Sequence, residues 1–223
     1  MPTNFQATVQ GYHPHNAHLL ALLSACAYST PAAVVPPPGV TLVDFVDEAD
    51  TTAVVCTSPD AAFVAFRGSV GRYDWLNTDA NTNLEPLSSF PLDLRRVHIG
   101  FLNALDAAQT QLDTLLALPS VAGKPLWLTG HSLGGALAVL LAARMTLLEG
   151  RPVQGLYTFG QPRVGNRTFA RVLGEALSDR YFCILRAHDP IPHCPSLLRY
   201  RPCGTQLLLA QDGKLYGELS FGE

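Results

Sequence analysis

A short turn between two strongly apolar segments constrains the fold of this chain more than any other feature. Residues 125–129 form a short apolar run of the kind that makes a buried strand. Residues 133–148 are apolar nearly all round, which is typical of a buried helix. The turn between them, at 130–134, reads Gly-His-Ser-Leu-Gly. A buried strand that passes directly into a buried helix predicts an α/β protein.

Strands and helices alternate along much of the remaining chain. Short apolar runs predict strands at 52–57, 61–66, 156–159, 181–186, 205–209 and 215–219. The first two runs flank Ser-Pro-Asp and the last two flank Asp212-Gly213, so each pair predicts a hairpin. Apolar residues that step by four and three from 101 to 115 indicate a helix, and 169–177 outline another. This order predicts a mostly parallel central sheet with helices on both faces.

Two further segments have a less regular pattern. The first helix is predicted to start at Asn16, a residue type that favours the N-cap, and to end at about Tyr28. Residues 70–96 show no clear periodicity. Loops of that length in compact domains are usually functional or disordered, so we expect a long loop here.

The composition fits a single domain that covers residues 1–223. With 48% hydrophobic residues, the chain can bury a sizeable core. Its formal net charge of −3 argues against nucleic acid or an acidic membrane surface as a partner. No apolar run approaches the roughly 18 residues that a membrane-spanning helix needs. Residues 19–27 resemble the apolar part of a secretory signal, but no Lys or Arg precedes Arg67, so we interpret them as an ordinary helix.

The five cysteines are odd in number and do not have the spacing of a metal site. Cys194 and Cys203 could pair with each other. Free thiols in a reducing compartment fit the pattern better, and we therefore expect a cytoplasmic location.

Ser132 is the candidate nucleophile. The pattern G-x-S-x-G at 130–134 follows a strand and opens a helix, which is the arrangement that exposes a reactive serine above a sheet. Gly130 and Gly134 carry no side chain that could clash at such a sharp turn. The N-terminus of the following helix would favour developing negative charge at the same place. A glycine-rich turn with an incidental serine is the alternative, and the strand–turn–helix context argues against it.

Two backbone amides are candidates for an oxyanion hole. One is the N–H of Leu133, directly after the nucleophile. The other is the N–H of Ser69, assisted by its hydroxyl, because Phe-Arg-Gly-Ser at 66–69 ends a predicted strand. Taken alone, Arg-Gly-Ser could equally be an ordinary turn.

Asp189 is the candidate acid that would orient a catalytic histidine. It follows the predicted strand 181–186 and precedes Pro190, which places it at the end of a strand. A turn aspartate before proline is the alternative interpretation.

Several motifs in one order resemble the fungal-type triacylglycerol lipase family, also called class 3 lipases. They are F-R-G-S at 66–69, D-W at 74–75, V-H-I-G-F at 97–101, T-G-H-S-L-G-G-A at 129–136, Y-T-F-G-Q-P-R-V-G-N at 157–166 and D-P-I-P-H at 189–193. The resemblance runs from about Asn16 to the C-terminus. It implies an α/β-hydrolase fold, an acyl-enzyme mechanism, and no metal or organic cofactor.

The resemblance also assigns roles to single residues. It implies Ser132 as nucleophile, Asp189 as the acid of the triad, and Ser69 with Leu133 as the oxyanion hole. It further implies a mobile lid after Ser69 that makes transient contact with a lipid interface. The apolar face of the lid would be formed by Tyr73, Trp75 and Leu76, although core packing would explain these side chains equally well.

The catalytic base is missing from this pattern. In α/β-hydrolases the chain order is Ser, then Asp or Glu, then His, and the only histidine after Asp189 is His193. Pro190 and Pro192 stiffen the four-residue segment between them, and His188 would share the strand end with Asp189. The other histidines fit the role less well and are His13, His15, His18, His98 and His131.

Two interpretations of the missing base stay open. The resemblance places the family's histidine several tens of residues further on, so the sequence is expected to be truncated at its C-terminus and to continue to a histidine in the open reading frame. Otherwise the chain would be a lipid- or ester-binding pseudoenzyme. The expected reaction is hydrolysis of carboxylic esters, by a triacylglycerol lipase, a phospholipase A1 or a short-chain esterase on the same scaffold.

Overall fold

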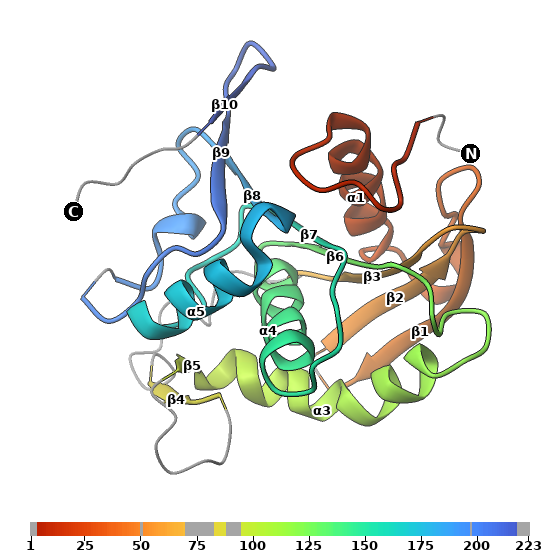
Figure 1. Cartoon of the computed structure of the whole chain (residues 1–223), viewed down its shortest axis with the longest axis horizontal. Coiled ribbons are helices and arrows are strands. Elements are labelled where there is room, and N and C mark those ends of the chain that lie inside the picture. The colour runs from red at the N-terminus through yellow and green to blue at the C-terminus, as the bar shows by residue number, and fades with distance from the viewer. Residues whose placement is uncertain (1–3, 50, 70–82, 88–94, 197, 218–223) are drawn as a thin grey trace.

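A central eight-stranded sheet organises the computed structural model, which describes residues 4–49, 51–69, 83–87, 95–196 and 198–217 (Figure 1). Its strands are β1 (Thr41–Glu48), β2 (Thr51–Thr57), β3 (Ala62–Phe66), β6 (Leu126–His131), β7 (Gly155–Phe159), β8 (Tyr181–Arg186), β9 (Thr205–Leu209) and β10 (Leu215–Gly217). They lie in the order β1-β2-β3-β6-β7-β8-β9-β10. The strands from β3 to β9 pair in parallel, whereas β1-β2-β3 and β9-β10 are antiparallel. The predicted mostly parallel sheet and both predicted hairpins are therefore confirmed, and residues 218–219 of the last predicted strand lie outside the described residues.

The register of the parallel strands brings their carboxyl ends to one edge of the sheet. Phe66 at the end of β3 pairs with Gly130 of β6, and His131 pairs with Phe159 at the end of β7. The loops that follow these strands therefore lie next to one another. We call this edge, with the loops after β3, β6, β7 and β8, the carboxyl edge.

Helices cover both faces of the sheet, as predicted. They are α1 (Pro14–Cys26), α3 (Ile99–Leu116), α4 (Leu133–Leu147) and α5 (Arg167–Leu177). Buried side chains of α1 pack with Phe63, Trp127 and Tyr157 on one face. Those of α3, α4 and α5 form a second cluster on the other face, where α4 lies between α3 and α5 (Figure 1). This position explains why α4 is apolar all round, since residues 134–143 are all buried.

The first helix differs from its prediction at both ends. It begins at Pro14 instead of Asn16, because proline is well suited to the first helical position, and it ends at Cys26 instead of Tyr28. Asn16 is fully buried and does not cap the helix. Its side-chain amide accepts from the Gln6 N–H and donates to the Gln6 carbonyl, both at 2.9 Å.

Two short strands lie in and directly after the segment that showed no periodicity. β4 (Leu84–Pro86) pairs antiparallel with β5 (Arg96–His98). Strands of three residues are too short to produce a recognisable alternation, which is why the sequence did not reveal them. Residues 70–82 and 88–94 lie outside the described part of the chain.

All five cysteines are free thiols, which confirms the prediction and excludes the Cys194–Cys203 pairing in this structure. Burial raises the pKa of Cys56 and of Cys183 to about 12, so these two thiols are unreactive. Within the ranges that the structure describes, no helix is both long and apolar enough to cross a membrane.

His98 joins the long helix α3 to the rest of the fold. It is the N-cap of α3, where its Nδ1 accepts from the Phe101 N–H at 3.4 Å and its ring stacks on the Phe101 ring. The side chain is 1% exposed, and burial lowers its pKa to about 4. The cap therefore requires a neutral imidazole.

Protonation of His98 should weaken the fold in acid. Because the pKa is near 6.5 in the unfolded chain and about 4 in the folded one, its contribution to stability is lost as the pH falls through that window. We expect a loss of about 3 kcal/mol in the free energy of unfolding, measured by urea titrations from pH 7 to pH 4. His98→Asn keeps a capping acceptor and should show a smaller pH dependence by about that amount. Equal slopes for the two proteins would contradict the assignment.

Two neighbouring leucines of α1 offer a matched test of the packing on that face. Leu23 is fully buried, whereas Leu22 is 40% exposed. Leu23→Ala should lower the free energy of unfolding by about 2–5 kcal/mol, since it leaves a cavity in the core. Leu22→Ala should change it by only about 0.5 kcal/mol. Equal effects in urea denaturation would show that α1 does not pack as described.

Candidate active site

Ser132 lies in the sharp turn between β6 and α4, in a strained backbone conformation. Its φ of 54° and ψ of −126° lie outside the regions that a residue with a side chain normally adopts. The turn is held by hydrogen bonds from the Ser132 N–H to the Phe159 carbonyl and from the Gly135 N–H to the Ser132 carbonyl, both at 2.9 Å. The residue is 6% exposed. The structure thus has the strand–turn–helix geometry that the motif predicts.

The glycines on either side of Ser132 are required by close backbone contacts. A Cβ on Gly134 would lie 2.2 Å from the Phe66 carbonyl oxygen, and one on Gly130 would lie 2.3 Å from the Gly134 carbonyl. Both distances are far below any real contact. The turn can therefore close against the end of β3 only without side chains at these two positions.

The two candidate oxyanion donors belong to segments that lie at this turn. Leu133 is the first residue of α4, where a backbone N–H has no acceptor within the helix. Ser69 directly follows Gly68, and a Cβ on Gly68 would lie 3.3 Å from the Ser132 Cβ. The loop after β3 therefore lies against the serine, as the sequence analysis expected.

Asp189 lies beyond the end of β8 on the same carboxyl edge. Its Oδ1 accepts from the Ile191 N–H at 3.0 Å. Its Oδ2 is directed towards Gly160, where a Cβ would lie 2.8 Å from that oxygen. The carboxylate lines a pocket of about 630 Å³, together with residues that include His131, Phe159 and His188.

Arg163 holds the segment that follows Asp189, a role that the sequence analysis did not assign. Its buried guanidinium donates from Nη1 to the carbonyls of His193 and Pro195 at 2.5 and 2.6 Å. Its backbone N–H donates to the Cys194 carbonyl at 2.7 Å. Its place in the F-G-Q-P-R-V-G motif was the signal that could have identified it.

His131 and Tyr28 form a second pair that the sequence analysis missed. The Tyr28 hydroxyl hydrogen-bonds the His131 Nδ1 at 2.8 Å. The pKa of His131 is lowered because its ring is partly withdrawn from water, and the negative charge of Asp189 partly offsets this effect. No local pattern connects a residue after the first helix with one that is 103 positions away.

The structure does not bring a histidine to Ser132. Within the described residues, the Ser132 hydroxyl has no hydrogen bond to any of the seven histidines. His98 is buried under α3, whereas His188 and His193 are exposed.

The predicted lid residues Tyr73, Trp75 and Leu76 lie outside the described part of the chain. No cluster of His, Cys, Asp or Glu that could hold a metal is found among the described residues.

Comparisons with known proteins agree with this geometry. The family model described as Lipase (class 3) matches residues 63–198. The curated lipase of Rhizomucor miehei is 34% identical over 156 residues, which cover 66% of this chain and 41% of that protein. Phospholipase A1-IIalpha of Arabidopsis thaliana is 30% identical over 165 residues, which cover 60% of this chain and 39% of that protein. Lipase II from Rhizopus niveus superposes with a TM-score of 0.79 at 23% identity, over 95% of this chain and 87% of that one.

The family match spans more than half of the chain and includes both Ser132 and Asp189. The chain belongs to the class 3 lipase family. The resemblance predicted from the motifs is thereby confirmed, together with the α/β-hydrolase fold. This class 3 lipase spans about two fifths of the length of the two curated relatives described above.

The contact between Gly134 and β3 can be tested by a single methyl group. Gly134→Ala places a Cβ against the Phe66 backbone and should lower the free energy of unfolding by about 3 kcal/mol. Gly174 in α5 has no atom within 4 Å of its Cβ position, so Gly174→Ala should instead stabilise by up to about 1 kcal/mol. Urea denaturation distinguishes the two, and a neutral Gly134→Ala would contradict the close contact.

Proposed function

We propose that this class 3 lipase hydrolyses carboxylic esters of lipids through an acyl-enzyme on Ser132. The observation that carries the proposal is the strained turn at Ser132, with the start of α4 and the loop after β3 both against it. Strain of this kind persists only where surrounding contacts hold it, and it is characteristic of reactive residues. The family relationship supports the same reaction class.

In the proposed mechanism, the Ser132 hydroxyl attacks the ester carbonyl and gives its proton to a base. The N–H groups of Leu133 and Ser69 hold the resulting oxyanion. The base returns the proton to the leaving alcohol, which departs and leaves an acyl ester on Ser132. Water, activated by the same base, then releases the acid and restores the serine. Asp189 orients the base and stabilises its protonated form.

The base belongs, in this proposal, in the pocket beside Asp189. The Asp189 Oδ1 is occupied by the Ile191 N–H, whereas its Oδ2 is available on the side of Gly160. The pocket of about 630 Å³ is large enough for an imidazole ring next to that oxygen. A base placed there would have the carboxylate behind it, as a triad requires.

The similarity to known lipases and phospholipases is the basis for proposing which lipid esters are the substrates. We favour acylglycerols, and a phospholipase A1 or a short-chain esterase activity on the same scaffold is the second candidate, since one relative is named a phospholipase A1. A pseudoenzyme that binds lipid without turnover is favoured by one observation, the absence of a described histidine at Ser132.

The five free thiols support a reducing, cytoplasmic location.

Added imidazole tests the proposed function directly. The 223-residue chain alone should hydrolyse p-nitrophenyl esters very weakly, because it retains the nucleophile and the oxyanion donors without a base. Imidazole should raise the rate in a saturable manner as it occupies the pocket beside Asp189. Initial rates against imidazole concentration measure both the rescue and the apparent affinity.

Two variants separate the roles. Ser132→Ala should abolish the rescue, and Asp189→Asn should weaken it by about two orders of magnitude or more, since the imidazole loses its orienting carboxylate. Rescue that is unaffected by Ser132→Ala would refute the proposal. Strong activity without imidazole that disappears in His193→Ala would show that the base was assigned wrongly, and lipid binding without any turnover would establish the pseudoenzyme.

A further inference from the structure

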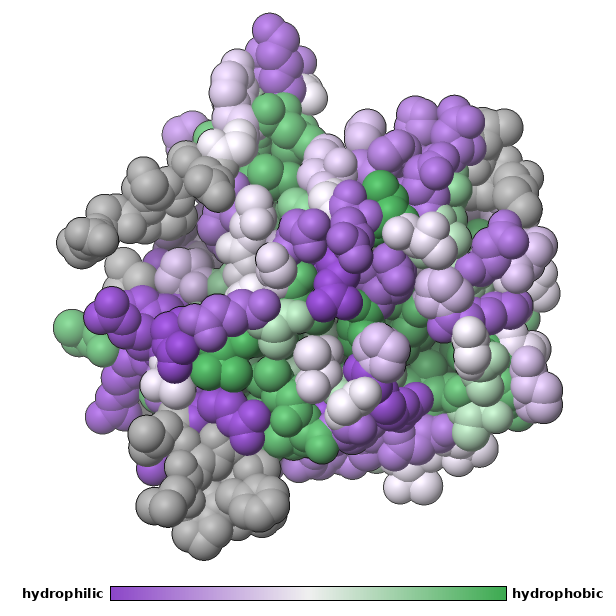
Figure 2. Space-filling model, in the orientation of Figure 1, coloured by the Kyte–Doolittle hydropathy of each residue, from purple (hydrophilic) through white to green (hydrophobic). Residues whose placement is uncertain are grey.

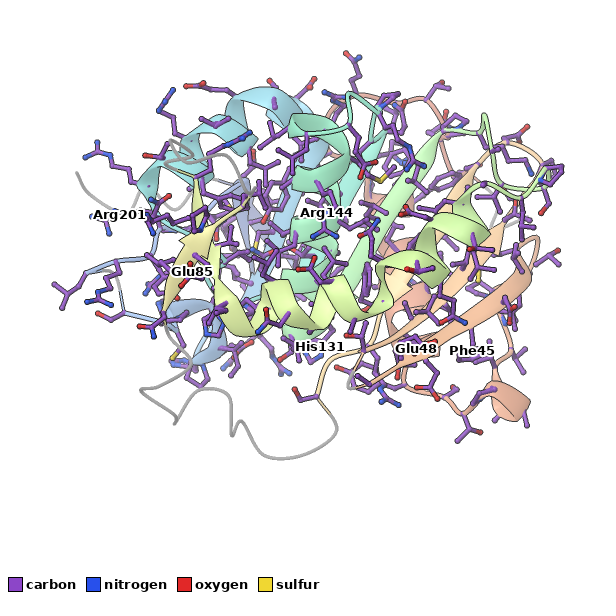
Figure 3. The ribbon with its side chains drawn as sticks, turned by 90° about the horizontal axis from the view of Figure 1, so that it is seen from below. Phe45, Glu48, Glu85, His131, Arg144 and Arg201 are labelled. Carbon is purple, nitrogen blue, oxygen red and sulfur yellow. The ribbon has the colours of Figure 1, made fainter. Side chains whose placement is uncertain are left out.

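Four arginines lie on three distant segments that meet at one corner of the molecule. Gly165 forms bridges with Val97 on one side and with Arg201 on the other. These contacts bring together four arginines, which we call the basic corner: Arg96, Arg167, Arg199 and Arg201. Figure 3 shows Arg201 near Glu85 at one end of the molecule, with His131 further along the same view.

The basic corner carries a local excess of positive charge. Arg96, Arg167 and Arg199 are exposed, and none of them forms an ion pair with a carboxylate of the described residues. Figure 2 shows a largely hydrophilic surface where α5 begins. Glu85 on β4 is the acidic neighbour, opposite Val97. Among the described residues, the corner therefore has the opposite sign to the net charge of −3 of the whole chain.

An exposed apolar side chain lies in the same segment as two of these arginines. Leu198 is 92% exposed, the highest value among the large apolar residues that the structure describes, followed by Val35 at 80%. It directly precedes Arg199 in the segment that follows Asp189. Leu198 and Arg199 therefore present an apolar and a cationic side chain next to each other at the surface.

The backbone on both sides of Leu198 is anchored. On one side, Arg163 holds the carbonyls of His193 and Pro195. On the other side, Tyr200 is 1% exposed, and the Arg201 N–H donates to the Gly165 carbonyl at 2.9 Å. Between these anchors the Tyr200 N–H donates to the Ser196 carbonyl at 3.3 Å. The fold thus presents Leu198 outward from a fixed base.

An exposed apolar side chain beside arginines matches a surface that has an anionic rim and an apolar interior. Arginine guanidinium groups attract acidic lipid headgroups, and a leucine inserts into the acyl region below them. A soluble polyanion would use the arginines but gain nothing from Leu198. The combination therefore favours an anionic lipid interface over nucleic acid.

We propose that Leu198 and the basic corner form a docking surface for an anionic lipid interface. The surface lies on the segment that leaves Asp189, and α3 and α5 both begin at the same carboxyl edge as the Ser132 turn. Docking there would bring the lipid to the side of the molecule that carries the proposed site. The proposal goes beyond ester hydrolysis, because it concerns membrane binding and requires no turnover.

Vesicle flotation with the full chain tests this surface. The probes are vesicles of phosphatidylcholine alone and of phosphatidylcholine mixed with phosphatidylglycerol. The chain should bind the mixed vesicles more tightly, and about 0.5 M salt should remove most of the difference by screening the arginines. Arg167→Gln with Arg199→Gln should weaken binding about 25-fold, at about fivefold per arginine. Leu198→Ser should weaken binding to the mixed vesicles about tenfold.

Matched controls come from the opposite edge of the sheet. Arg151→Gln removes a partly exposed cation there, and Leu148→Ser replaces a partly exposed apolar residue just after α4. Both should bind vesicles like the original chain. Thermal unfolding of every variant separates loss of binding from loss of folding.

Several outcomes would overturn the proposal. Equal binding to both kinds of vesicle would overturn it, and so would variants at the basic corner that bind vesicles like the controls. A third such outcome is that a polyanion such as heparin displaces the original chain and Leu198→Ser from the mixed vesicles equally well. Ser132→Ala should bind vesicles normally. Vesicle binding without imidazole-dependent hydrolysis would therefore refute the proposed function alone, and the reverse result would refute only the docking surface.

Discussion

The carbonyl oxygen of Phe66 occupies the space where a side chain on residue 134 would have to lie. This contact joins the end of β3 to the first turn of α4, and most of the site depends on it. Because the two segments touch, the loop with Gly68 and Ser69 lies beside Ser132, and the first N–H groups of α4 are directed to the same place. In the proposed mechanism, this contact is what would let the N–H groups of Ser69 and Leu133 hold one oxygen.

The sequence predicted the parts of the fold that have strong local patterns. The continuous apolar run of α4, the stepped leucines of α3 and the short strands of the parallel sheet all follow from periodicity, and the turn at Ser132 follows from its glycines. The start of α1 was misplaced, because Pro14 outweighs Asn16 as a helix start and because Asn16 is used to hold Gln6. β4 and β5 escaped prediction because three residues cannot show an alternation.

The site was predictable only where its residues lie in contiguous motifs. Ser132, Leu133, Ser69 and Asp189 each stand at a strand end that the sequence reveals. The Tyr28–His131 pair and the contacts of Arg163 join residues that are 103 and about 30 positions apart, so they leave no local signal.

The environment of Arg163 has a consequence for the conditions under which the Asp189 segment keeps its shape. The buried guanidinium is bound by the peptide carbonyls of His193 and Pro195 instead of by a carboxylate. Peptide carbonyls do not titrate, and arginine stays protonated throughout the range in which proteins fold. A loop fixed by an ion pair would loosen once its acid became protonated, whereas this clamp contains no group that an acidic compartment could neutralise. The backbone that carries Asp189 would therefore keep its support in mild acid, and acid sensitivity would begin instead at histidines whose pKa is lowered by burial, such as His98 and His131.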